Sequence, residues 1–432
     1  MPTDPGPLPF DACDVTPEAI AARMRWARTR GHPAYLWPDV PMPAWRAALE
    51  AIERATMALL ADPTRPARLE LPPTASVKAL GVAAYTSGLG PLLGYWIEAG
   101  RLEADPDASA LLALHLAHGR RRAERLSREL VRALDVLSAA GLHPLVLKGT
   151  HTGRAYFPEA GTRPSSDIDL AVAPTEADAA NRALAAAGYV LKQRQPQLSR
   201  WDWVPPGAPT QLRSLELSHA DDPYTIDLHA SLDRNFFGVR TVSLGDPAGD
   251  PTRPWLAMHP AARVLRQPYL TAYLAAHASE GLHNLTLVRL VELVLVARAD
   301  VAAGELRWEE LHALLEARGA LRFAYPAFEL AERLAPGTID PGLRAALAAA
   351  ATPRMTRIIG ALRPSGAQRL ERLSLAERFM WGTGPMDHLR RALEMAWPRW
   401  ARSSPWRLPG IYAERIFRLL RGRVAWRGPS RR

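Results

Sequence analysis

Apolar residues recur at helical spacing along both flanks of the chain. The longest such pattern covers residues 111–137, with arginine and glutamate on its outer face, and the pattern returns at 270–278 and 282–299. Apolar positions three and four residues apart are typical of a helix with one buried face. We therefore expect helices over most of residues 15–140 and again over 261–350.

Between residues 145 and 232 the pattern changes to that of strands. Four short segments are apolar or alternate between apolar and polar positions: 145–147, 167–172, 212–218 and 224–229. A period of two is typical of strands with one buried face. Helices are expected between the strands at 152–157 and at 175–187, the second with Thr175 as N-cap. This order predicts an α+β fold with a small mixed sheet and helices on one face.

Turn residues set the boundaries within and around this sheet. If Asp221 and Asp222 form a two-residue hairpin loop, Glu216 lies directly opposite Asp227, an unfavourable pair unless a cation lies nearby. A Gly/Pro/Asp-rich connector follows at 236–254. We expect four parts: a helical N-terminal region at 1–140, a sheet core at 141–245, a helical domain at 255–352 and a basic C-terminal region at 353–432.

The composition is that of a folded protein, with 432 residues, 48% hydrophobic and 23% charged. Cys13 is the single cysteine, which excludes an internal disulfide and a cysteine-rich metal site. The first residues lack a basic and apolar leader, so we expect a cytoplasmic protein. Residues 79–97 are uncharged, but glycines and a proline interrupt them. They predict a buried helical hairpin and no transmembrane segment.

The net charge of +10 is concentrated in one region. Residues 353–432 contain eighteen arginines and five acidic residues, so the rest of the chain carries about −3. Five of the thirteen tryptophans lie there: Trp381, Trp397, Trp400, Trp406 and Trp426. Arginine among aromatics suits nucleic acid or an anionic membrane surface. Prolines interrupt the region, however. This favours the interpretation that the tryptophans pack its helices onto the rest of the protein.

Carboxylates at alternate positions mark the candidate chemistry. Asp167 and Asp169 share one face of an expected strand, and Asp227 lies on a later strand. Two Mg²⁺ ions roughly 3.5–4 Å apart would relieve the repulsion between such groups, and their usual chemistry is phosphoryl or nucleotidyl transfer. Gly149 and Thr150 lie where a strand meets a helix, a place that favours a phosphate group. Lys148 precedes them and is one of only three lysines, against fifty-one arginines.

Together these residues resemble the nucleotidyltransferase superfamily of the DNA polymerase β type, whose pattern is a Gly-Ser turn, Asp-x-Asp and a third carboxylate. The closer resemblance is to a bacterial family of uncharacterised nucleotidyltransferases. Three segments carry it: Leu147-Lys148-Gly149, then Arg163 ahead of Asp167-Ile168-Asp169-Leu170, and finally Asp227-Leu228-His229. Thr150 replaces the usual serine, and Asp167 follows Gly149 by eighteen positions, more than the wider superfamily's spacing.

The resemblance implies a polymerase β-like core and a Mg²⁺-dependent enzyme. Asp167, Asp169 and Asp227 would be catalytic and would hold two Mg²⁺ ions. The implied nucleotide-binding residues are Lys148, Gly149, Thr150, Arg163 and His229. The enzyme would move a nucleoside monophosphate from an NTP, with ATP expected, and would release pyrophosphate. The acceptor stays open among a small molecule, a peptide, a protein and a tRNA.

Several alternatives stay open at this stage. Arg163 fits a solvated loop as well as a phosphate contact. His229 fits a residue that orients Asp227 or faces the substrate, and it fits a structural histidine equally well. His151 is expected at the surface, and neither His277 nor His283 is at metal-ligand spacing. The carboxylates would also suit a phosphohydrolase or a glycosyl transfer from a nucleotide sugar. A nucleotide-binding protein without turnover is the remaining alternative.

Overall fold

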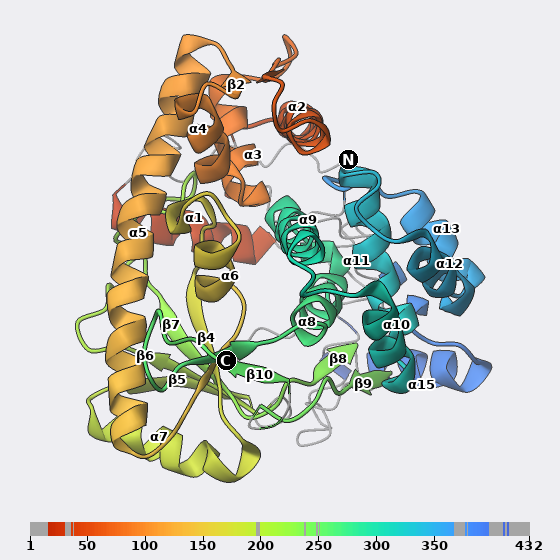
Figure 1. The fold of residues 1–432 in the computed structure, drawn as a ribbon. Coiled ribbons are helices and arrows are strands. Elements are labelled where there is room, and N and C mark those ends of the chain that lie inside the picture. The colour runs from red at the N-terminus through yellow and green to blue at the C-terminus, as the bar shows by residue number, and fades with distance from the viewer. Residues whose placement is uncertain are drawn as a thin grey trace.

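This computed structural model describes residues 16–30, 36–37, 39–195, 199–236, 239–247, 249, 251–366, 376–377, 379–396, 409–410 and 413. A mixed sheet lies among helices that come from both flanks of the chain (Figure 1). Among the described residues, no helix is both long and apolar enough to cross a membrane.

The N-terminal part is helical, as its apolar pattern predicts. Its helices are α1 (Pro17–Arg30), α2 (Met42–Ala61), α3 (Val77–Ser87), α4 (Gly90–Glu98) and α5 (Pro106–Ala139), and the short strands β1 (Ala67–Arg68) and β2 (Leu102–Glu103) pair in parallel. The expected hairpin at 79–97 is confirmed as α3 and α4, which meet at Gly88 with a φ of 74°. Asp105 caps the long α5, because its side chain accepts a hydrogen bond from the Ala108 N–H at 2.9 Å.

The main sheet has seven strands in the order β10-β11-β3-β4-β7-β6-β5. Their bounds are β3 (Leu145–Val146), β4 (Asp167–Ala171), β5 (Val190–Gln195), β6 (Arg200–Val204), β7 (Thr225–His229), β10 (Thr252–Pro254) and β11 (Arg263–Leu265). The central strands β4 and β7 are parallel, and β3 and β6 flank them in antiparallel pairs. The expected strands at 145–147, 167–172 and 224–229 are therefore confirmed.

The expected strand at 212–218 is wrong. These residues form a loop, and β7 pairs instead with β6, a strand that the sequence patterns did not reveal. The Asp222 carboxylate holds the loop by accepting hydrogen bonds from the Arg213 and His219 N–H groups, at 2.7 and 2.9 Å. Glu216 consequently lies away from Asp227 and forms an ion pair with Lys78 at 3.5 Å.

Two further local expectations need correction. The connector at 236–254 contains a hairpin of β8 (Arg234–Phe236) and β9 (Arg240–Val242), followed by β10. The helix expected at 175–187 begins as a 3₁₀ turn, η3 (Pro174–Glu176), and continues as α7 (Ala177–Ala186). Thr175 lies inside the 3₁₀ turn and therefore does not cap α7.

Helices cover both faces of the sheet, and not the single face that was expected. Ile168, Leu170 and Ile226 point to a core that includes the inner sides of α5 and α7. On the other face, Leu145, Leu147 and Ala171 belong to a larger core with α8 (Tyr269–Ser279) and α9 (Leu287–Ala302). The short α6 (Thr150–Ala155), expected at 152–157, and the 3₁₀ turn η2 (Ala160–Thr162) follow β3 in the chain.

Helices complete the described chain: α10 (Trp308–Ala317), α11 (Leu321–Leu334), α12 (Pro341–Ala350), α13 (Pro353–Gly360) and α15 (Pro385–Ala396), with the 3₁₀ turn η5 (Leu282–Asn284) between α8 and α9. Trp381 is fully buried against the rings of Phe236 and Phe323, with centroids 4.7 and 5.6 Å away. The packing role expected of the tail's tryptophans is confirmed at this residue. The other four, Trp397, Trp400, Trp406 and Trp426, lie outside the described residues.

Candidate active site

Three carboxylates meet at the centre of the sheet. Asp167 and Asp169 come from β4 and Asp227 from the parallel strand β7, where Asp227 lies directly beside Asp169. Each of the three offers an oxygen within 4.8 Å of the others. The alternation of β4 buries Ile168 and Leu170 on the opposite face, which leaves the carboxylates on the face toward α8 and α9.

Burial and mutual repulsion separate the acidities of two of these groups. Burial, with the nearby charges of Asp167 and Asp169, raises the pKa of Asp227 to about 8. Burial opposes ionisation of Asp169 too, but Lys148 and His229 outweigh it and hold the pKa of that carboxyl below its usual value. A site that concentrates negative charge in this way is suited to a divalent cation.

Positively charged side chains balance this charge. The Lys148 ammonium forms a buried ion pair with Asp169 Oδ2, and the Arg200 guanidinium does so with Asp227 Oδ2. Thr225 Oγ1 donates a 2.9 Å hydrogen bond to the second oxygen of Asp227. By contrast, the carboxylate of Asp167 has no hydrogen bond or ion pair within the part of the chain that the structure describes. Asp167 therefore offers a free ligand at the open side of the cluster.

Of the two acids on the neighbouring strands, His229 contacts Asp169 and not Asp227. Its Nε2 is hydrogen-bonded to Asp169 Oδ1 at 3.3 Å. Burial lowers the pKa of His229 despite this carboxylate, so the ring is neutral at pH 7. A neutral imidazole at this place fixes the orientation of the Asp169 carboxylate.

The Gly149 turn has the conformation that its sequence indicates. Gly149 has a φ of 73°, and a Cβ there would lie 3.0 Å from Ser165 Oγ, so a side chain would be strained. The Ser165 hydroxyl in turn donates to the Asp167 carbonyl at 3.0 Å. Ser165 thus lies close to the turn and is hydrogen-bonded to the first residue of β4, next to the carboxylates.

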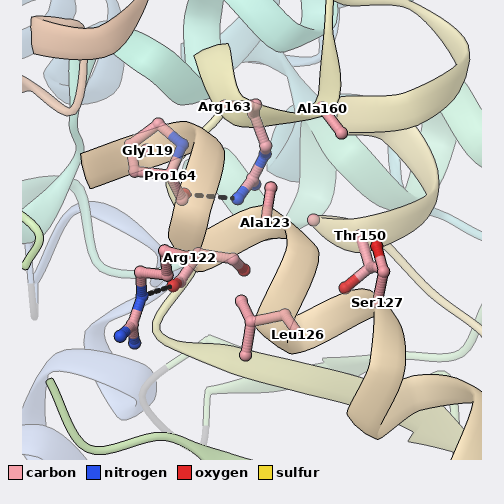
Figure 2. Close-up of a pocket in the computed structure, with 11 residues that line it drawn as sticks. Gly119, Arg122, Ala123, Leu126, Ser127, Thr150, Ala160, Arg163 and Pro164 are labelled. Atoms are coloured by element: carbon pink, nitrogen blue, oxygen red, sulfur yellow. Dashed lines mark hydrogen bonds between the residues drawn. The ribbon is translucent and has the colours of Figure 1, made fainter. Parts of the chain in front are cut away.

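A hollow lies between this turn and α5 (Figure 2). Its polar lining includes Arg122, Ser127, Thr150 and Ser165. The Thr150 hydroxyl is buried and has no hydrogen-bond partner among the described residues. An unpaired buried hydroxyl is costly, and a bound ligand could satisfy it.

Arg122 organises the loops that lead into the two carboxylate-bearing strands. Its guanidinium donates to the carbonyls of Ser165, Asp222 and Pro223, at 2.7, 2.9 and 3.1 Å. Ser165 lies two residues ahead of Asp167, and Pro223 lies four residues ahead of Asp227. One side chain of α5 thus fixes the start of both β4 and β7.

Arg163 is not exposed to solvent, and its N–H donors are not free to bind a phosphate. Its Nε and Nη2 donate to Glu292 of α9, at 3.0 and 2.8 Å, and its Nη1 donates to the Pro164 carbonyl at 3.1 Å (Figure 2 shows the last of these). The Thr152 hydroxyl also hydrogen-bonds to Glu292. Arg163 therefore connects the sheet region to α9.

His151 is buried, which contradicts the expected surface position. Its ring packs edge-on against Trp255 and Tyr156, with centroids 5.1 and 6.0 Å away. Burial, and to a lesser extent Arg253, lowers the pKa of His151 to about 4. The ring is neutral and belongs to the packing around α6.

Sequence reasoning missed two charged residues of β6 that complete the site. Asp202 lies directly opposite Asp227, and Arg200 contacts both carboxylates, with its Nε 2.8 Å from Asp202 Oδ1. The signal was present in Arg200-Trp201-Asp202-Trp203, which alternates polar and aromatic positions. Trp203 is buried in the opposite core, as that alternation requires.

Comparison with known proteins agrees with this geometry. A protein-family model for uncharacterised nucleotidyltransferases matches residues 75–336, more than half of the chain and the whole of the sheet. No curated protein and no solved structure matches. By the family match, the chain belongs to the uncharacterised nucleotidyltransferase family.

Proposed function

We propose that this chain is a Mg²⁺-dependent enzyme that transfers a nucleoside monophosphate from an NTP to an acceptor and releases pyrophosphate. The observation that carries the proposal is the convergence of Asp167, Asp169 and Asp227 from two parallel strands. Membership of a nucleotidyltransferase family supports the same reaction class. Strands β3, β4 and β7 with the Gly149 turn would then form a polymerase β-like core.

The three acids fit a divalent metal because their oxygens converge, repel one another when ionised and leave the Asp167 carboxylate without another partner in the described chain. When bound, two Mg²⁺ ions would neutralise phosphate charge and activate the acceptor hydroxyl. In this proposal, Lys148 and His229 hold the Asp169 carboxylate in place for the metal. Asp227 takes part in accepting the proton of the acceptor hydroxyl.

Lys148 and His229, expected from the sequence to bind the nucleotide, are thus proposed to position Asp169 instead. Of the other three expected nucleotide-binding residues, Arg163 also changes role. Gly149 allows the backbone to approach a phosphate closely, and the free hydroxyl of Thr150 could donate to it. Arg163 is proposed as a positioning residue, since Glu292 and Pro164 occupy its donors. ATP is the first nucleotide to test, and the acceptor is a small molecule, a peptide, a protein or a tRNA.

The test is label transfer from an NTP. The protein is incubated with Mg²⁺, cell extract and each NTP labelled at the α-phosphate, and we expect a labelled acceptor together with free pyrophosphate. Asp169→Asn should reduce the rate about a hundredfold or more, because a group that acts on the developing charge is lost. Asp233→Asn is the matched control, since Asp233 is exposed and lies outside the cluster.

The products separate this proposal from its rivals. A phosphohydrolase would release the labelled α-phosphate in free nucleotide or phosphate, with no labelled acceptor. A binding protein without turnover would retain NTP unchanged. An equal rate in the wild type and Asp169→Asn would contradict the role assigned to the carboxylates.

A further inference from the structure

Two helices opposite the carboxylates carry polar groups that have no partner. The side chain of Arg289, in the first turn of α9, makes no hydrogen bond or ion pair within the described ranges, and His277 of α8 has a buried Nδ1 without a hydrogen-bond partner. Both helices pack against the sheet face that bears the carboxylates, since Leu147 and Ala171 share their core. Arg289 and His277 therefore border the candidate site from the side away from the sheet.

The positively charged side chains around Arg289 each contact a carboxylate, whereas Arg289 itself does not. Arg163 is bound by Glu292, and Lys148 by Asp169. Arg234 lies 3.4 Å from Glu280 and is hydrogen-bonded to Tyr273. Arg289 is the cation of this group that has no such carboxylate contact in the described chain.

The surroundings disfavour positive charge at both side chains. Burial, followed by the like charge of Arg163, lowers the pKa of Arg289, while Glu292 and Asp167 act in the opposite sense. Burial also lowers the pKa of His277, and Arg289 and Lys148 contribute to this shift. An anion between these groups would relieve the repulsion and supply the missing hydrogen-bond acceptors.

The position of Arg289 indicates what that anion is. A nucleotide that reacts at the carboxylates has its α-phosphate there, and the rest of its phosphate chain must continue to a neighbouring surface. Glu292, one helical turn beyond Arg289 on α9, is bound by Arg163 and Thr152 beside the Gly149 turn, so the start of α9 lies against the candidate site. Arginine suits phosphate because its planar group offers several donors in a fixed arrangement.

We propose that Arg289, assisted by His277, binds the β- and γ-phosphates of the NTP. The inference rests on the proposed function and assigns to α8 and α9 a part in substrate binding. The sheet would hold the reacting phosphate, and the helices would hold the pyrophosphate that leaves.

Inorganic tripolyphosphate with Mg²⁺ tests this directly, because it removes the unknown base and acceptor. Calorimetry should show binding to the wild type and an affinity about tenfold to a hundredfold weaker for Arg289→Ala, the range for a hydrogen bond to a charged group. Arg289→Lys should recover part of the loss. Arg318→Ala makes the same change of charge at an exposed arginine and should bind as the wild type does.

A melting experiment without ligand separates binding from folding. Because the half-buried Arg289 side chain has no counter-charge in the described chain, Arg289→Ala should melt at the wild-type temperature or higher, whereas a structural role would lower it. Unchanged tripolyphosphate affinity in Arg289→Ala, absent binding by the wild type, or a lower melting temperature would each overturn the inference. Label transfer by the wild type is a separate measurement, so failure of the proposed function remains distinguishable.

Discussion

At the scale of single residues, Asp227 has the most informative environment in the site. Its carboxylate is almost completely buried beside two other carboxylates, and Arg200 only partly offsets them. A pKa of about 8 means that Asp227 holds a proton at neutral pH when no metal is bound. Asp169 differs because Lys148 and His229 both contact it. Neighbouring acids of the same type thus have opposite protonation states.

Metal binding should therefore release a proton. A carboxylate must be ionised to bind Mg²⁺, so below pH 8 the metal displaces the proton of Asp227. We expect about one proton per protein near pH 6.5, and an affinity that rises about tenfold per pH unit and levels off above pH 8. Calorimetry in buffers of different ionisation enthalpy measures the proton count. Asp227→Asn should remove it, and binding of Mg²⁺ to the wild type at pH 6.5 without proton release would contradict the assignment.

Which residues share the site could be predicted only in part from the sequence. Strand alternation correctly placed Asp167 with Asp169, since a period of two depends on local geometry alone. The partner of Arg163, by contrast, is Glu292, 129 positions further along the chain. His151 is buried because Trp255, also distant in sequence, packs on it. No local pattern reports contacts of that kind.

At the scale of elements, the difference between local pattern and distant contact also explains why the strand expected at 212–218 is wrong. Residues 212–218 alternate as a strand does, but the carboxylate of Asp222 satisfies two of the backbone N–H groups in that region. Satisfied donors have no need of a sheet partner. β6 was missed although Trp201 and Trp203 alternate as strand residues do, because the other face carries the charged residues Arg200 and Asp202. Their place in a strand is explained by Asp227, which lies opposite Asp202 and is distant in sequence.

The connection between the sheet and α9 depends on one buried ion pair. Glu292 is 1% exposed and accepts hydrogen bonds from Arg163 and Thr152. Glu292→Ala leaves the Arg163 guanidinium buried without a counter-charge, so we expect a loss of about 3–5 kcal/mol in the free energy of unfolding. Urea denaturation measures this loss.

An exposed pair on a nearby helix provides the control. Glu310 of α10 lies 3.3 Å from Arg307, the residue that precedes this helix, and about half of the Glu310 side chain is exposed. Glu310→Ala should cost no more than about 1 kcal/mol. Similar losses in the two variants would mean that the Arg163–Glu292 pair does not stabilise the connection between sheet and helices.

At the scale of the whole molecule, a single apolar core contains residues from all four of the parts expected from the sequence. It includes Ile20 and Trp45 near the start of the described chain, Leu147 of the sheet region, Leu290 of α9 and Trp381. The four parts were expected because the composition changes between them. Composition alone does not indicate which surfaces of these parts pack against one another. Helices from both flanks of the chain therefore pack into one core with residues of the sheet region.

Trp381 tests whether the C-terminal part is integral to that core. Its indole is fully buried and contacts Phe236 of β8 and Phe323 of α11. Removing a buried tryptophan ring leaves a cavity and costs about 3–5 kcal/mol, so Trp381→Ala should lower the melting temperature of the whole protein in a single transition. Trp381→Phe should lose less, because it keeps an aromatic ring in the cavity. If residues beyond 353 formed an independent unit, the variant would instead melt in two steps, and the sheet would retain the wild-type transition when followed by calorimetry and by Mg²⁺ binding.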